Sequence, residues 1–222
     1  MLTASAPAPF RRLGRRLAEL RACASGVALT EFAMSLPVLL TLGLFGLETA
    51  NFAMAHLRVS NIAMITADNA ARVRDSIDEG DVIDLLNGSK LTGQGIRFAE
   101  NGRIVLSSIE RNAANNGQWI RWQRCDGARS FNSAYGPEGT GQTNSSLQYV
   151  GPASSPISAA SGTAVMVVEV SYIYQPIIPN SFLSGREIRY ESAFNVRQRT
   201  NQALTNNGNL SAERRTCNLY QA

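Results

Sequence analysis

The fold depends most on residues 26–73, which read GVALTEFAMSLPVLLTLGLFGLETANFAMAHLRVSNIAMITADNAARV. Within this stretch, residues 32–47 form a run of 16 residues without a charged side chain, flanked by Glu31 and Glu48. Adding residues 27–30 extends the run to 21 residues, interrupted only by Glu31. A membrane-spanning helix needs about 20 apolar residues, so residues 27–47 are predicted to cross a lipid bilayer.

The residues that follow continue the helical pattern. Residues 48–74 contain neither proline nor glycine, and apolar side chains recur at helical spacing, at Phe52, Ala55, Val59, Ile62, Thr66 and Val73. We therefore expect one helix from about Val27 to Arg74. At 1.5 Å per residue it is roughly 70 Å long, and its second half carries a stripe that covers a soluble domain or another subunit.

The positive charge lies ahead of this helix. Residues 1–26 hold five arginines and one glutamate, a net charge of +4, which is the whole formal charge of the chain. Basic residues before a membrane span remain in the cytoplasm. The pattern thus predicts a single pass through the inner (cytoplasmic) membrane, with the N-terminus cytoplasmic and residues beyond about Glu48 periplasmic. The neutral remainder has no basic cluster for nucleic acid, so no nucleic-acid partner is expected.

Three fates of the N-terminal segment remain open from the residues alone. Cleavage after Gly26 would leave the apolar run at the start of the mature chain. Residues 53–55 read Ala-Met-Ala, a pattern at which signal peptidase cuts, and cleavage after Ala55 would release a soluble periplasmic binding or envelope protein. Without any cleavage, the chain would be a permanently anchored periplasmic protein.

The order of residues around Gly26 resembles a known family. Gly26 is followed by four uncharged residues, then Glu31 and Phe32, then an apolar run with an early proline, Pro37, and an exit containing Gly46 and Glu48. This order is similar to the TadE-like pseudopilins of the tight-adherence (Tad/Flp) pilus system. The resemblance implies a minor pilin-like subunit that assembles or primes a type IV-like pilus.

The resemblance also implies roles for particular residues. Prepilin peptidase would cut after Gly26 and leave Val27 with a free α-amino group. Glu31, then the fifth residue, would pair with such a group, and together with Phe32 would set the register of assembly. The implied partners are prepilin peptidase, other pilins and pseudopilins, an inner-membrane assembly platform and the lipid bilayer. Pro37 has no N–H and is predicted to bend the helix.

The chain beyond the helix predicts an α+β domain. We expect a leader (1–26), a pilin-like helix (27–75) and an exterior domain (76–222). A short helix should begin at an Asp81 N-cap and end near residues 87–88. Period-two or continuous apolar patterns predict a mostly antiparallel sheet of about four strands, packed on the helix. The strands are expected at residues 103–110, 118–124, 163–174 and 187–199, and residues 126–162 form a long loop or an ordered excursion.

The candidate chemical groups are few. No motif of a hydrolase, zinc protease, nucleotide-binding loop or dithiol redox site occurs in the sequence. We therefore expect neither catalysis nor a metal or other cofactor. His56, the single histidine, is predicted to be a surface residue. Trp119 and Trp122 are expected on opposite sides of a strand, one in the core, and Glu169 and Glu187 are candidates to meet across neighbouring strands.

Two cysteines remain once the leader is excluded. Cys125 follows the second predicted strand, and Cys217 lies in the polar tail. In an oxidising compartment a pair of this kind favours one disulfide, and two free thiols are the alternative. A bridge would close a loop of about 90 residues and, in the chain-entropy model, stabilise the fold by roughly 4–5 kcal/mol.

Overall fold

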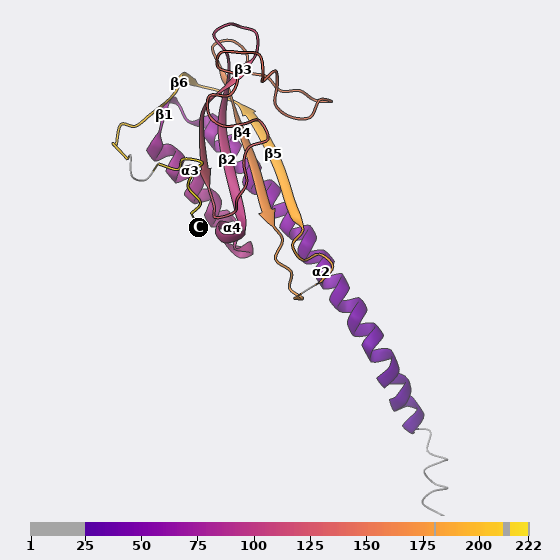
Figure 1. Ribbon diagram of the computed structural model, residues 1–222. Helices are drawn as coiled ribbons and strands as arrows, with labels where there is room; N and C mark the ends of the chain where they lie inside the picture. The colour runs from indigo at the N-terminus through magenta and orange to yellow at the C-terminus, as the bar shows by residue number, and fades with distance from the viewer. Residues whose placement is uncertain (1–24, 180, 211–213, 222) are drawn as a thin grey trace, which may run out of the picture. The chain divides into compact units, whose positions relative to one another are not determined.

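The computed structural model describes residues 25–179, 181–210 and 214–221. The leader predicted at residues 1–26 therefore lies almost entirely outside the described residues. The chain divides after Thr49 into two compact units, Met1–Thr49 and Ala50–Ala222, and each is described by itself. Helix α2, Ser25–Arg72, contributes residues to both units (Figure 1), which confirms the single helix expected from about Val27 to Arg74.

In the first unit, α2 presents an apolar surface. All residues from Gly26 to Leu47 are exposed, including Val27, Phe32 and Phe45. The segment from Gly26 onward is long and apolar enough to cross a membrane. A helix that is apolar on every side has no polar face to turn toward water, so its length and composition suit a lipid or protein environment.

In the second unit, four strands form one antiparallel sheet. They are β2 (Gly102–Arg111), β3 (Gln118–Asp126), β4 (Ala164–Ile173) and β5 (Glu187–Asn195), in the order β3-β2-β4-β5. This confirms the α+β class with a mostly antiparallel four-stranded sheet. Strand β4 is buried on both faces except at its last residue, because α2 covers one face and a loop excursion covers the other.

Small side chains let α2 approach the sheet closely. The predicted stripe is confirmed, since Val59 and Ile62 are fully buried and Phe52 and Val73 pack against the same core. Five alanines of α2 are also buried here, at Ala55, Ala63, Ala67, Ala70 and Ala71. They face sheet residues that include Leu106, Met166 and Val168. A row of alanines leaves no room for a larger side chain in a close-packed core.

The excursion between β3 and β4 builds a second, smaller core on the opposite face. Leu147, Val150 and Ala159 of the excursion pack with Ile109 and Ile120 of the sheet. Two isolated bridges, Gln118 with Leu147 and Val150 with Ile157, hold the excursion in place. Of the two alternatives for this region, the structure therefore shows an ordered excursion.

The fourth strand, predicted at residues 187–199, is shorter than expected. Strand β5 ends at Asn195, and Arg199–Thr205 forms a separate strand, β6, in a parallel pair with β1 (Asp75–Asp78). Strand β1 is absent from the prediction because its sequence, DSID, has no apolar run. A parallel partner far along the chain, 124 residues or more away in this register, supplies the missing hydrogen bonds.

The short helix begins earlier and ends later than predicted. Helix α3 spans Glu79–Thr92, and its N-cap is Asp78. Asp81 takes the third helical position instead, because its carboxylate accepts a hydrogen bond from the backbone N–H of Asp78 while Asp78 caps Asp81 in return. A 3-10 turn, Gln94–Ile96, and the short α4, Phe98–Asn101, then lead into β2.

The prediction that Trp119 and Trp122 face opposite sides of the sheet is wrong. Ser108 pairs with Trp122, but the next residue, Ile109, pairs with Ile120, which leaves residue 121 as a β-bulge. The bulge shifts the alternation by one residue. Both indole rings consequently line one pocket on the same side. Trp122 is the core residue of the two, and Trp119 is half-buried.

The alanine row gives a direct test of the packing. Replacing Ala67 by leucine adds three carbons to a fully buried position, so we expect the free energy of unfolding to fall by about 1–3 kcal/mol. The control is Ala53→Leu on the exposed side of the same helix, which should change it by less than about 0.5 kcal/mol. Denaturant titration followed by tryptophan fluorescence measures both, and equal stability of the two variants would contradict the packing described.

Candidate functional site

The first candidate site is the start of α2. Gly26 and Val27 lie in its first turn, and both are exposed. Glu31 lies four residues after Val27 and therefore on the neighbouring turn of the same side of the helix. Phe32 is 58% exposed. The structure thus brings Val27 and Glu31 to one short stretch of helix surface, surrounded by apolar side chains.

Gly26 has a structural property that matters for testing its role. A methyl group added at Gly26 would meet no atom within 4 Å, and the same holds for Gly43 and Gly46. Neither a close contact nor an unusual backbone angle therefore requires glycine at position 26 in this structure. A need for glycine at this position would have to come from another molecule.

Pro37 lies inside α2 without ending it. The hydroxyl of Thr41 donates a hydrogen bond of 2.7 Å to the Pro37 carbonyl, an interaction within one turn of the helix. The bend expected at Pro37 stays a prediction.

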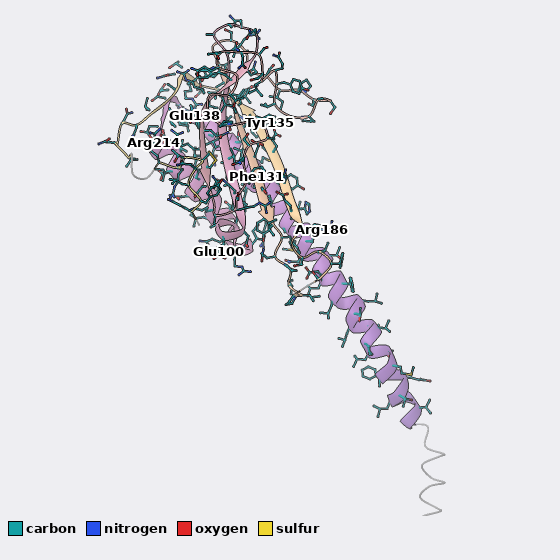
Figure 2. All side chains as sticks on the ribbon, in the orientation of Figure 1. Glu100, Phe131, Tyr135, Glu138, Arg186 and Arg214 are labelled. Carbon is teal, nitrogen blue, oxygen red and sulfur yellow. A yellow bond between two sulfur atoms is a disulfide. The ribbon has the colours of Figure 1, made fainter. Side chains whose placement is uncertain are left out.

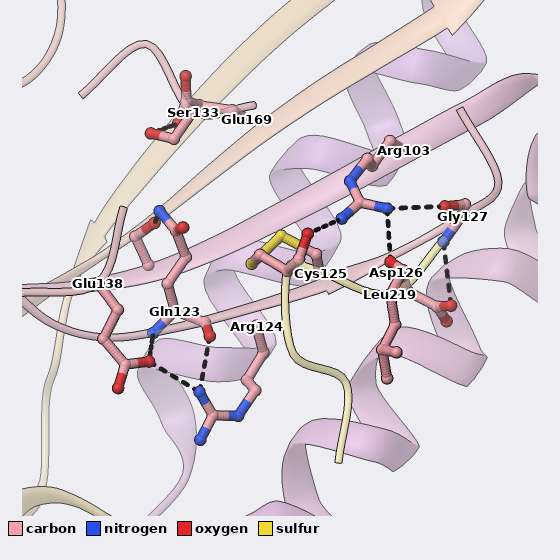
Figure 3. Close-up of a disulfide and its surroundings, with 12 residues drawn as sticks. Arg103, Gln123, Arg124, Cys125, Asp126, Gly127, Ser133, Glu138, Glu169 and Leu219 are labelled. Carbon is pink, nitrogen blue, oxygen red and sulfur yellow. Dashed lines mark hydrogen bonds and ion pairs between the residues drawn. A yellow bond between two sulfur atoms is a disulfide. The ribbon is translucent and has the colours of Figure 1, made fainter. Parts of the chain in front are cut away.

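The second candidate site lies at the end of β3, where three consecutive residues hold the C-terminal tail. Cys125 forms a disulfide with Cys217 across 92 residues (Figure 3), which is the pairing that the sequence suggests. Its backbone N–H also donates to the carbonyl of Arg215, at 2.7 Å. We call Arg124, Cys125 and Asp126, together with the tail residues that they hold, the tail clamp.

Arg124 holds the tail through a buried carboxylate. Its guanidinium donates to both carboxylate oxygens of Glu79, at 2.6 and 3.0 Å, and to Glu138 at 2.9 Å. Arg214 of the tail donates to the same Glu79 at 2.7 Å. Burial acts to raise the pKa of Glu79, but the hydrogen bonds and charges of Arg124 and Arg214 outweigh it, so the pKa lies below its usual value.

Asp126 holds the tail from the other side of the disulfide. Its side chain is buried, and one carboxylate oxygen lies 3.2 Å from the ammonium of Lys90 in α3. Arg215 of the tail lies 4.0 Å from the other oxygen. Glu79, which pairs with Arg124, and Asp126 thus bind the tail arginines Arg214 and Arg215 on either side of the covalent link at Cys125.

Arg103 is the largest fully buried side chain in the described part of the chain. Its guanidinium donates to the carbonyls of Cys217, at 2.6 Å, and Leu219, at 2.9 Å (Figure 3). A third hydrogen bond, of 3.0 Å, goes to the carbonyl of Gly127. The ring of Tyr220 lies 4.1 Å from the guanidinium. Arg103 therefore fixes the backbone of the tail from inside the fold.

Gly127 allows this arrangement because of its backbone conformation. Its φ of +110° is unfavourable for residues with a side chain, and an added Cβ would collide with the carbonyl of Gly102.

Neither Arg103 nor Glu79 was predicted from the sequence as a functional residue. Arg103 could have been found, because a charged residue at the start of the apolar run of β2 needs a partner when it is buried.

Two other expectations about chemical groups need correction. His56 is half-buried rather than a surface residue, because its Nδ1 lies 3.1 Å from the hydroxyl of Tyr190 and its ring packs edge-on against Phe52. Glu169 lies opposite Glu191, and Glu187 lies opposite Ile173 instead. The Ser133 hydroxyl donates to Glu169, whose pKa is raised chiefly by burial.

No arrangement for covalent chemistry emerges from these contacts. The carboxylates of Glu169 and Glu191 are taken up by hydrogen bonds from Ser133 and Tyr135. Among the described residues, no group of three or more His, Cys, Asp or Glu side chains is placed to hold a metal ion. The first site offers an apolar surface for binding, and the second holds the tail.

The depressed pKa of Glu79 predicts how stability depends on pH. Its ionised form is stabilised by folding, so the stabilisation is fully present above the unfolded pKa of about 4.3 and is lost as the pH falls through the lower folded pKa. Glu79→Gln leaves the buried Arg124 with Glu138, whose side chain is 51% exposed, as its ion-pair partner. The free energy of unfolding should therefore fall by about 3 kcal/mol at neutral pH, the lower end of the range for a broken buried pair.

The measurement is denaturant unfolding of the two proteins between pH 7 and pH 3. The difference in unfolding free energy should be constant down to about pH 5 and then shrink. Glu100→Gln, a change at an exposed glutamate of α4, serves as the control and should match the wild type throughout. A Glu79→Gln difference that does not vary with pH would contradict the assigned role.

Comparison with known proteins picks out the first site. The family model described as TadE-like protein matches residues 26–73, which confirms the resemblance found in the sequence. The matched segment begins one residue after the start of α2 and ends one residue past its end. No curated protein and no solved structure matches the chain.

Proposed function

We propose that this chain, whose TadE-like segment marks a pilin-like protein of the Tad pilus system, is a minor pseudopilin processed after Gly26. In this proposal, prepilin peptidase removes residues 1–26 and leaves Val27 as the first residue. The mature subunit stays in the inner membrane through residues 27–47, with the second unit in the periplasm. It assembles with other pilins and pseudopilins on an inner-membrane platform and primes or joins a pilus.

The observation that carries the proposal is the match between family segment and helix. The TadE-like segment starts at Gly26, the residue at which the apolar, exposed part of α2 starts. An exposed apolar helix needs either lipid or neighbouring helices around it. Processing before this segment, not after it, would keep that helix in the mature subunit.

Glu31 has a defined part in the proposal. After cleavage, the α-amino group of Val27 and the carboxylate of Glu31 lie one helical turn apart. A carboxylate among apolar side chains is costly unless a positive group neutralises it. An α-amino group of the same or a neighbouring subunit supplies that charge and thereby sets the axial register, while Phe32 adds apolar contact.

The alternative of release after Ala55 is weakened by the second unit. The side chain of Ala55 is 2% exposed and belongs to the main core. The Asn51 side chain donates a 2.7 Å hydrogen bond to the hydroxyl of Tyr174, and the ring of Phe52 packs against the same tyrosine. Cleavage after Ala55 would remove these contacts from a folded unit.

Substitution at Gly26 tests the processing step. Gly26→Ala should leave the leader attached, so that the membrane-bound chain runs as the larger precursor on an immunoblot from the native host. Gly43→Ala is the matched control, because both glycines lie in α2 with open space for a methyl group. We expect the control to be processed like the wild type.

Two results would count against the proposal. Normal processing of Gly26→Ala would exclude a prepilin-type cut at this position. A leader retained in both variants would point to a general defect in membrane insertion and would remove the support for Gly26 in particular.

A further inference from the structure

A cavity lies beside the disulfide of the tail clamp. Its volume is about 440 Å³, within the range of about 300–1,000 Å³ for small-ligand sites. Three segments form its walls: the end of β3, the loop at residues 131–137, and the tail at residues 217–220. The disulfide joins the tail to the end of β3 beside this cavity, so residues far apart in sequence form its walls.

Two aromatic rings belong to the lining. Phe131 comes from the loop (Figure 2) and Tyr220 from the tail. The guanidinium of Arg103 lies 4.1 Å from the centre of the Tyr220 ring, and that of Arg189 lies 5.1 Å from the centre of Phe131. A cation on one face of each ring fixes the ring's position, and Tyr220 remains 45% exposed.

Side-chain amides supply the polar part of the lining. Asn132 and Asn218 are exposed, and no hydrogen bond from either amide to another described residue is present. Each amide offers two donors and one acceptor. The amide of Gln123 is held in place by hydrogen bonds to Ser107 and to the Gly136 carbonyl. Of the described residues that line the cavity, none carries a formal charge.

We propose that this cavity binds a neutral saccharide. The C–H groups on one side of a sugar ring carry a small positive charge and pack against the negative face of an aromatic ring. The hydroxyl groups at the ring's edge act as donors and acceptors, which amides match in both roles. The site therefore fits one or two uncharged sugar rings. This inference goes beyond the proposed assembly function and does not depend on processing at Gly26.

Charged ligands and extended peptides fit this cavity less well. An anion would need a free cationic group, but the guanidinium of Arg103 is committed to the tail backbone and that of Arg189 pairs with Glu187. A peptide strand would need a free edge of β3. There the N–H of Cys125 already donates to Arg215 and that of Gln123 to the Glu138 carboxylate.

The test uses the full chain in lipid nanodiscs, because common detergents with sugar headgroups would compete for the site. A glycan array carrying neutral, sialylated and sulfated oligosaccharides identifies the class, and calorimetry with the strongest neutral glycan gives the affinity. We expect Tyr220→Ala and Asn132→Ala each to weaken binding at least about tenfold, a loss of about 1.4 kcal/mol. Tyr149→Ala, at an exposed tyrosine outside the cavity, is the control and should bind like the wild type.

Asn132 lies on the surface, so its variant keeps the fold even where Tyr220→Ala loosens the tail. Four outcomes would overturn the proposal. The first three are the absence of any neutral glycan among those bound, a preference for sulfated or sialylated glycans, and wild-type affinity in the Asn132→Ala protein. A loss of affinity in Tyr149→Ala equal to that in Asn132→Ala would also overturn it, because binding would then lie elsewhere.

Discussion

The packing of the second half of α2 on the sheet is the constraint on which the rest of the second unit depends. Five buried alanines let the helix lie close to β2 and β4, and their small size makes the fit sensitive to any added atom. Seven helix residues between Ala55 and Ala71 are part of the core itself. The same helix continues from the apolar segment that begins at Gly26. A membrane-suited segment and a core-forming segment thus belong to one secondary-structure element.

The tail clamp holds the C-terminal tail on the second unit. The chain after β6 has little apolar sequence with which to fold back, so it is held by specific bonds. Arg214 of the tail pairs with Glu79, which also binds Arg124, and Arg215 lies beside Asp126. Cys217 is joined to Cys125, and Arg103 fixes the tail backbone. Buried charges are costly unless they are paired. Each guanidinium and carboxylate of the clamp accordingly contacts an opposite charge or a carbonyl group.

The sequence predicts well what depends on local pattern. Heptad spacing located α2, and continuous apolar residues located β4, because the hydrophobic periodicity of an element is set by its own geometry. Features that depend on distant residues were missed. Strand β1 is defined by β6, far along the chain, and the bulge at residue 121 by pairing with β2. The partners of His56 and Arg103 come from strands and tail segments that no local pattern connects. The disulfide joins distant residues but was still predicted, because only two cysteines follow the leader and the fold brings these two together. The processing site and the bend at Pro37 remain predictions from sequence.

If α2 serves both as membrane segment and as core helix, the mature protein must keep all of it. The most direct measurement is the N-terminal residue of the mature chain purified from membranes of its native host. We expect Val27, which leaves the apolar segment and the core helix intact. A chain beginning at His56 would contradict this, because the fold would then have lost Phe52 and Ala55 from its core.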